Sequence, residues 1–212
     1  MILIWILAFA ITITIHEAAH AWMADRLGDP SARLAGRLTL NPIAHYDPIG
    51  TTLLLILVIM RSLGIPVIPF GWAKPVPVDP YNLAHPRRDS AIISFAGPMS
   101  NIALAGILAI VIRAFPGITL LNFIYPVIIL NVALAVFNLI PIHPLDGGKV
   151  LVGLLSPREA RRVDIFLNRY GMFLLLLIIF PVFGGVSLIS LIVGPAISFI
   201  INLLLPGLPQ LI

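Results

Sequence analysis

Five segments of this chain are long and apolar enough to cross a lipid bilayer, and they leave little room for any soluble fold. They cover about residues 1–23, 91–114, 118–141, 164–183 and 186–206. About 20 apolar residues suffice for one helical span. Only 10% of the 212 residues are charged, whereas soluble domains carry about 25%. We therefore predict an all-α polytopic membrane protein with about five full transmembrane helices.

A sixth apolar run, about residues 49–63, is shorter, contains Arg61 and is followed by Gly64-Ile65-Pro66. Runs of this length more often form a re-entrant or interfacial element than a full span. We expect such an element here.

Two proline-rich stretches, 36–42 and 71–78, alternate weakly between apolar and polar residues. This pattern suits short edge strands, so small β-strands are expected in this loop region. The sequence shows no repeat and no separate soluble domain. We expect a single domain, 1–212, with a loop or re-entrant insertion at about 24–90.

Basic residues predict the orientation. Ten of the 13 fall in three loops: Arg26, Arg33, Arg37, Lys74, Arg87, Arg88, Lys149, Arg158, Arg161 and Arg162. Short basic loops lie on the cytoplasmic side of membranes, so the excess of positive charge indicates orientation and not a nucleic-acid partner. We predict a multi-pass protein of the cell membrane with its N-terminus outside. The apolar N-terminal run lacks a basic start and a cleavage site, and we expect it to remain in the mature protein.

The first apolar segment contains His16-Glu17-Ala18-Ala19-His20. On a helix, His16 and His20 lie on one face, one turn apart, and two such imidazoles can share a zinc ion. Glu17 lies beside them, where it can accept a proton from water that zinc has made acidic. The chain has no cysteine, so any metal must be bound by His, Asp or Glu.

A short motif of this kind also arises by chance, and polar residues near a helix end can simply contact lipid headgroups. Its context favours function, because ionisable groups inside a spanning helix are costly. Because the basic loops are expected on the cytoplasmic side, the position of the motif late in the first segment predicts an active site toward the cytoplasmic leaflet.

A catalytic zinc site normally has three protein ligands, and Asp146 is the best third candidate. It follows the 118–141 segment, where prolines end the helix and Gly147-Gly148 allow a tight turn. The alternative is that Asp146 caps a helix that starts near Gly147. Asp146 and the histidines can meet only if 49–63 does not cross the membrane once. That segment must dip in and return, or pair with 65–70 in a double crossing.

Three motifs together resemble the site-2 protease family of intramembrane zinc metalloproteases. They are His16-Glu17-Ala18-Ala19-His20, Ala96-Gly97-Pro98-Met99-Ser100-Asn101, and the stretch Asn138-Leu139-Ile140-Pro141-Ile142-His143-Pro144-Leu145-Asp146-Gly147-Gly148. They occur in the family's order and span most of the chain. The chain looks like a compact prokaryotic branch without PDZ or nucleotide-sensing domains.

The resemblance implies that His16, His20 and Asp146 bind one Zn²⁺ per chain and that Glu17 is the catalytic base. It also implies a zinc metalloendopeptidase that hydrolyses peptide bonds within or near transmembrane segments of membrane proteins, in regulated intramembrane proteolysis. Expected partners are transmembrane substrates, the lipid bilayer, and an upstream protease or a regulatory membrane protein. Asn138 and Asn101 are candidates for contact with the substrate or its oxyanion. The alternative role for both is a hydrogen bond between helices.

Two other functions are compatible with a membrane metal site. One is a metal-ion transporter or sensor, which would need ionisable residues along the whole bilayer. The other is an inactive scaffold, against which the intact Glu17 argues. His143 could support the site or act as an alternative ligand, and His45 could contact a metal or substrate; neither is assigned a role from the sequence.

Overall fold

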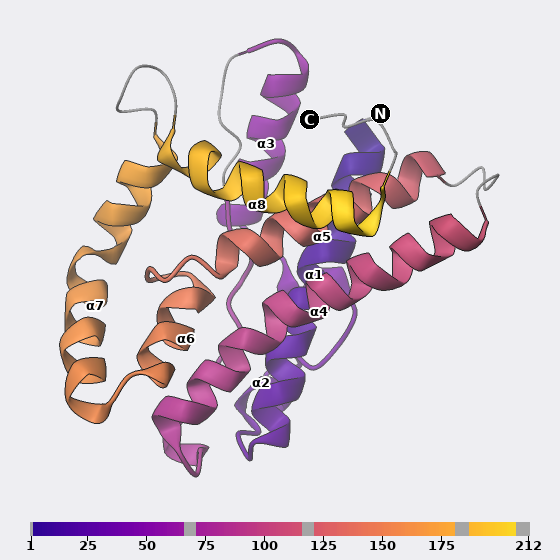
Figure 1. Cartoon of the computed structure of the whole chain (residues 1–212). Coiled ribbons are helices and arrows are strands. Elements are labelled where there is room, and N and C mark those ends of the chain that lie inside the picture. The colour runs from indigo at the N-terminus through magenta and orange to yellow at the C-terminus, as the bar shows by residue number, and fades with distance from the viewer. Residues whose placement is uncertain (1, 66–70, 116–120, 181–186, 207–212) are drawn as a thin grey trace.

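Figure 1 shows the computed structural model of the chain, which describes residues 2–65, 71–115, 121–180 and 187–206. All regular structure in these residues is helical. The helices are α1 (Ile2–Arg26), α2 (Ser31–Leu34), η1 (Pro42–His45), α3 (Gly50–Ser62), η2 (Pro80–Asn82), α4 (Pro86–Ala114), α5 (Leu121–Asn138), α6 (Asp146–Leu154), α7 (Pro157–Ile179) and α8 (Leu188–Leu204).

Helix α1 forms from a mostly apolar, alanine-rich run and ends at Arg26, two residues before a glycine. Gly28 takes a positive φ of 101°, which costs glycine little because it has no Cβ. The N–H of Asp29 then donates to the carbonyl of Ala24 at 2.9 Å. This bond closes the last turn as in a Schellman motif, so the helix stops soon after its His-Glu segment.

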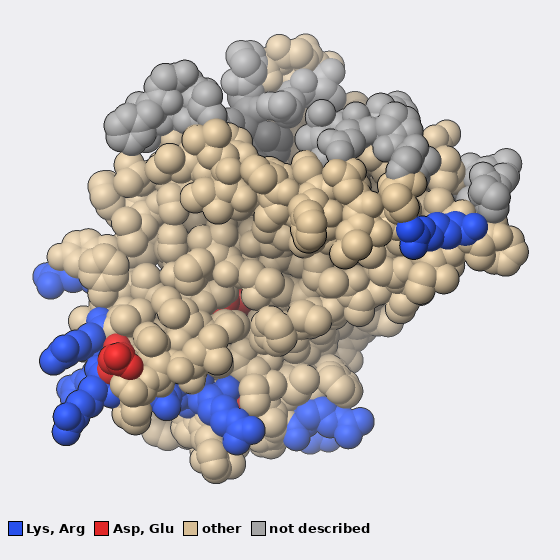
Figure 2. Space-filling view, viewed as in Figure 1, with Lys and Arg blue, Asp and Glu red and all other residues tan. Residues whose placement is uncertain are grey.

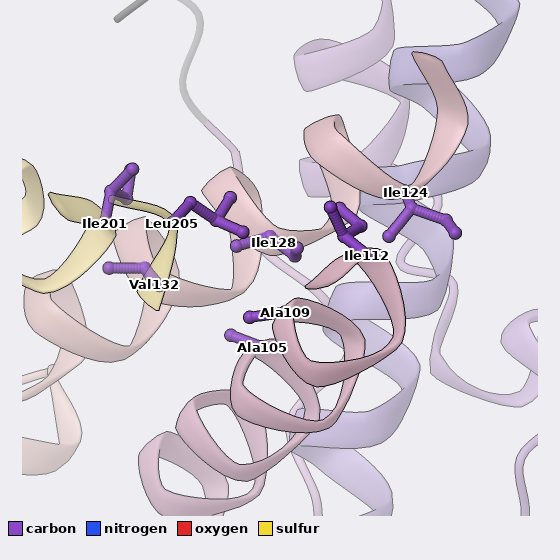
Figure 3. Packing of buried hydrophobic residues seen from close by; sticks show 8 residues of the cluster. All are labelled: Ala105, Ala109, Ile112, Ile124, Ile128, Val132, Ile201 and Leu205. Atoms are coloured by element: carbon purple, nitrogen blue, oxygen red, sulfur yellow. The ribbon is translucent and has the colours of Figure 1, made fainter. Parts of the chain in front are cut away.

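Three of the described helices are long and apolar enough to cross a membrane: α1 with 25 residues, α4 with 29 and α5 with 18. They pack against one another, and α8 lies across α4 and α5 (Figure 1). Small side chains of α4 let the other helices approach closely (Figure 3). The buried cluster that joins α4, α5 and the end of α8 consists of Ala105, Ala109, Ile112, Ile124, Ile128, Val132, Ile201 and Leu205.

The prediction of about five full spans is not supported. The predicted spans 164–183 and 186–206 do form helices α7 and α8 within the described residues. However, the first half of α7 is charged and amphipathic, and α8 is only 17 residues long. The charges that shorten the apolar part of α7 are Arg158, Glu159, Arg161, Arg162, Asp164 and Arg169.

The predicted β-strands are wrong, because no strand forms in the part of the chain that the structure describes. Residues 71–79 form no regular element, and only one backbone hydrogen bond joins them to the 42–45 turn, from the N–H of Lys74 to the carbonyl of His45 at 3.0 Å. The carbonyls of Trp72 and Lys74 accept from the side chains of Thr51 and Arg37 and not from the backbone of a neighbouring strand. No ladder forms.

The chain leaves along α3 and comes back to the place where α3 begins. The hydroxyl of Thr51 donates to the carbonyl of Trp72 at 3.2 Å, and Gly50 lies directly against the Trp72 ring. Segment 49–63 therefore does not carry the later chain to the far end of the molecule. The expected return of the chain after this segment is confirmed, whereas the predicted pairing with 65–70 lies mostly outside the described residues.

Basic side chains gather at one end of the molecule. Figure 2 shows most of the lysines and arginines low in the view, where Figure 1 places the end of α1 and the beginnings of α4 and α7. Arg113 instead lies in the last turn of α4, at the opposite end of that helix. The helices thus have one strongly basic end.

Candidate metal centre

His16 and His20 project from consecutive turns of α1 and meet Asp146, the first residue of α6. The two Nε2 atoms are 3.1 Å apart. The Oδ2 atom of Asp146 lies 3.1 Å from Nε2 of His16 and 3.3 Å from Nε2 of His20. Both histidines are buried. The structure therefore brings together the three residues that the sequence predicted as ligands.

Neighbouring groups orient both imidazole rings. Nδ1 of His20 donates to the carbonyl oxygen of Ile93 at 2.7 Å, and Nδ1 of His16 donates to Oδ1 of Asn101 at 2.6 Å. A carbonyl oxygen only accepts hydrogen bonds, so each Nδ1 carries the ring's proton. In each neutral ring the lone pair of Nε2 then faces the centre of the group.

Two lone pairs and a carboxylate oxygen thus converge in a buried place, which is unfavourable unless a cation lies between them. Zinc ligands at about 2.0–2.1 Å in a tetrahedron lie about 3.3 Å from one another. The three observed separations match that edge length. The residues present therefore fit a four-coordinate metal ion with one position left open. They are the only group of this kind in the described residues.

Asp146 is placed by the irregular chain between α5 and α6. Helix α6 begins at Asp146 itself, its N-cap is Leu145, and no side chain caps it. The alternative reading of Asp146 as a helix cap is therefore wrong. A Cβ at Gly147 would overlap the carbonyl oxygens of Leu139 and Ile140, so only glycine permits the turn that aims Asp146 at the histidines.

Helix α4 closes the other side of the group through Gly97. A Cβ at this position would lie 2.6 Å from Cε1 of His20 and 2.8 Å from Cε1 of His16. Such contacts are too short for any side chain. Gly97 therefore lets α4 approach closely, and the groups it admits are the two histidine rings.

Glu17 follows His16 on α1 and is half-buried. Its carboxylate forms no hydrogen bond or ion pair with the described residues, although its charge acts on His20. An unpaired carboxylate beside the three candidate metal ligands is free to exchange a proton. Its role as catalytic base remains a prediction.

Asn101 is placed differently from a substrate-binding residue. It is fully buried, and its amide contacts His16, Thr12 and Asn131. It therefore holds a histidine ring from behind, and the alternative of a hydrogen bond between helices describes it better. Asn138 is half-buried and donates to the carbonyl of Leu134 in its own helix at 3.1 Å, so its predicted substrate contact is still a prediction.

The two unassigned histidines lie outside this group. Nε2 of His143 is 3.1 Å from Oδ1 of Asp164 on α7, which ties the chain before α6 to that helix. His45 is 1% exposed and its Nε2 donates to the carbonyl of Thr39 at 3.0 Å. Both contacts join loops to their neighbours.

Sequence reasoning missed Asn131 and Thr12, which contact Asn101 behind His16. A signal existed for each. Asn131 is an amide in the middle of an apolar segment, and Thr12 precedes His16 by four residues, on the same face of the helix.

Comparison with known proteins identifies the family. Residues 115–178, which include Asp146, match the model of "Peptidase family M50". The Bacillus subtilis protein named "Putative zinc metalloprotease YwhC" is 38% identical over 162 residues, which cover 72% of this chain and 69% of that protein. The chain belongs to peptidase family M50. The resemblance to the site-2 proteases is thereby confirmed, and the chain is a metallopeptidase by membership.

Other relatives of this M50 peptidase agree. "Putative zinc metalloprotease Rip2" of Mycolicibacterium smegmatis is 34% identical over 169 residues, covering 74% of this chain and 59% of that protein. The Rip2 protein of Mycobacterium tuberculosis is 28% identical over 190 residues, covering 85% of this chain and 68% of its own length. No solved structure shows significant similarity to the chain.

Proposed function

We propose that this M50 peptidase is an intramembrane zinc endopeptidase that cleaves membrane proteins within or near their transmembrane segments. The observation that carries the proposal is the convergence of His16 Nε2, His20 Nε2 and Asp146 Oδ2 within 3.3 Å of one another. This group lies among helices long and apolar enough to cross a membrane. The names of the relatives, which include zinc, agree with it.

Each residue has a defined role in the proposal. His16, His20 and Asp146 hold one zinc ion, which supplies a Lewis acid that makes water acidic near neutral pH and polarises an amide carbonyl. Glu17 accepts the proton that the attacking water loses and returns it to the leaving nitrogen. The unpaired state of Glu17 among the described residues supports this role, because no competing partner holds its carboxylate.

An apolar cavity of about 310 Å³ supports the proposal that the substrate is a membrane protein. It lies between α1, η1 and α3, and Ile6, Phe9, Ala10 and Ile13 form its α1 wall. Ile13 precedes Glu17 by one helical turn and shares its face. A substrate helix must unwind locally for cleavage, because helical amides are shielded by their own hydrogen bonds. The cavity offers a place beside Glu17 for the apolar side chains of the unwound substrate.

The basic end of the molecule supports the proposed orientation in the cell membrane. His20 precedes Arg26 by six residues, or ~9 Å along the helix, so the metal group lies near the end of α1 where basic side chains gather (Figure 2). With that end cytoplasmic, the active site faces the cytoplasmic leaflet and the N-terminus lies outside.

The whole chain, 1–212, then acts as one protease domain, with an upstream protease or regulatory membrane protein preparing its substrates. A transporter would need further metal-binding groups along its path, and the described residues hold one group of three residues that could bind a metal.

The deciding experiment compares Glu17→Gln with wild type in detergent or liposomes. Substrates are trapped with Glu17→Gln in membranes, identified by mass spectrometry, and then offered to both proteins loaded with zinc. We expect Glu17→Gln to bind zinc as wild type does while cleavage falls about 10²–10⁴-fold. Glu159→Gln, which changes an exposed helix-capping carboxylate, should cleave normally. Wild-type cleavage by Glu17→Gln would overturn the proposal.

A further inference from the structure

Behind His16, three polar side chains form a buried network, one from each of the helices α1, α4 and α5. They are Thr12, Asn101 and Asn131, and each is at most 1% exposed. We infer that Asn131 is a positioning residue for the zinc site, which acts through Asn101 on the tautomer and direction of the His16 ring. The inference rests on the proposed zinc function.

Every amide group in the network has a partner. The Nδ2 of Asn101 donates to the backbone carbonyl of Thr12 at 3.0 Å and to Oδ1 of Asn131 at 2.7 Å. The Nδ2 of Asn131 donates to the hydroxyl of Thr12 at 2.8 Å and to the backbone carbonyl of Val127 at 2.7 Å. Oδ1 of Asn101 remains for His16.

Two backbone carbonyls determine the direction of the whole chain of hydrogen bonds. The carbonyls of Val127 and Thr12 can only accept, so the NH₂ groups of Asn131 and Asn101 must face them. Oδ1 of Asn131 then receives the second N–H of Asn101. As a result, Oδ1 of Asn101 faces His16 and requires a proton on Nδ1, which leaves the lone pair of Nε2 toward Asp146.

Asn131 therefore prevents the side-chain amide of Asn101 from rotating by 180°. A reversed Asn101 would present its NH₂ group to Nδ1 of His16 and its oxygen to the carbonyl of Thr12. The His16 proton would then move to Nε2 and point at Asp146, where it would remove one metal ligand. In a buried apolar environment a correctly paired network strongly disfavours such a reversal.

The test measures zinc affinity of the full chain in detergent by competition with a chelator at neutral pH. Asn131→Leu keeps the size of the side chain but cannot accept from Asn101. We expect its zinc affinity to fall about 10–100-fold, as for other groups that orient metal-binding histidines. Asn131→Asp still offers an acceptor oxygen to Asn101, so its affinity should lie clearly closer to that of wild type.

Val132→Ala is the matched control, because it removes buried volume at the next position of α5 without touching the network. It should lower thermal stability and leave zinc affinity unchanged.

Equal losses of zinc affinity in Asn131→Asp, Asn131→Leu and Val132→Ala would reduce Asn131 to a packing role and overturn the inference. Wild-type affinity in Asn131→Leu would also overturn it. If Asn131→Leu does not fold, Asn131→Ala, which also cannot accept from Asn101, takes its place with the same expected loss relative to Val132→Ala. Failure of wild type itself to bind zinc would instead overturn the proposed function.

Discussion

Oδ2 of Asp146 lies 3.1 Å from Nε2 of His16, although 130 positions separate the two residues in the chain. His16 belongs to α1, whereas Asp146 begins α6 after the chain has passed through α4 and α5. The metal group therefore exists only when these helices have packed together. Binding of a metal to it is expected to report on the assembly of the whole bundle.

Zinc should stabilise the folded protein, because the unfolded chain does not bring Asp146 to the histidines. At a free concentration of 100 times the dissociation constant, one bound ion adds about 2.7 kcal/mol to the free energy of unfolding. Thermal unfolding in detergent, with and without zinc, measures the effect. Asp146→Ala should lose it, whereas Asp25→Ala, which removes a carboxylate paired with Arg33, should keep it. An equal zinc response in Asp146→Ala would exclude Asp146 as a ligand.

Gly97→Ala should damage the metal group selectively. Its methyl group would overlap the rings of His16 and His20, so we expect reduced zinc binding and a loss of about 1–3 kcal/mol from overpacking. Gly106→Ala is the control in the same helix, since nothing lies within 4 Å of its added Cβ. It should keep zinc and gain up to about 1 kcal/mol in helix stability. Metal analysis of both purified proteins checks the prediction, and full zinc content in Gly97→Ala would contradict it.

Asp29 should make the free energy of unfolding depend on pH in the acidic range. It is fully buried just after α1. Burial by itself raises the pKa of the Asp29 carboxyl, but hydrogen bonds from Ser31, Asn82 and the N–H of Asp79 outweigh it and hold the pKa below the ordinary 3.8. A lowered folded pKa contributes stability above the unfolded pKa, and this contribution is lost as the pH falls through the folded value.

Wild type should therefore be more stable than Asp29→Asn at neutral pH, and the difference should shrink as the pH falls below about 4. Unfolding midpoints of both proteins in detergent across this range measure the difference. A difference that stays constant down to the lowest pH would show that the Asp29 charge is not the cause.

Arg37 should hold the 37–45 segment against residues 71–79. Arg37 is 5% exposed, and its guanidinium donates to the carbonyls of Ala44 and Lys74. Hydrogen bonds from a charged group contribute about 1.5–3 kcal/mol each when buried. Arg37→Met should lower the free energy of unfolding by about 2 kcal/mol and expose this loop to protease. Arg33→Met, at an exposed ion pair, should cost less than about 1 kcal/mol. Equal proteolysis rates in the two variants would contradict the prediction.

Local sequence patterns predicted the helices that depend on local composition. The apolar runs that predicted α1, α4 and α5 correspond to helices long enough to span a membrane, because hydrogen bonding in lipid leaves few other structures. The predicted strands at 36–42 and 71–78 were wrong, because alternation alone does not supply a backbone partner, and side chains of Thr51 and Arg37 take the carbonyls of Trp72 and Lys74. The predicted count of about five spans is not supported in the described residues, because the charged half of α7 shortens its apolar stretch and α8 is only 17 residues long.

The sequence alone determined the pairing of His16 with His20 and the position of Glu17 beside them, because a spacing of four residues has one outcome on a helix. It also limited the third partner to a carboxylate or a histidine, since the chain has no cysteine. Only the tertiary structure decided that Asp146 faces the histidines instead of capping α6, and that Asn101 and Asn131 stand behind His16. These contacts join residues 30 to 130 positions apart, so helix packing, and no local periodicity, sets them.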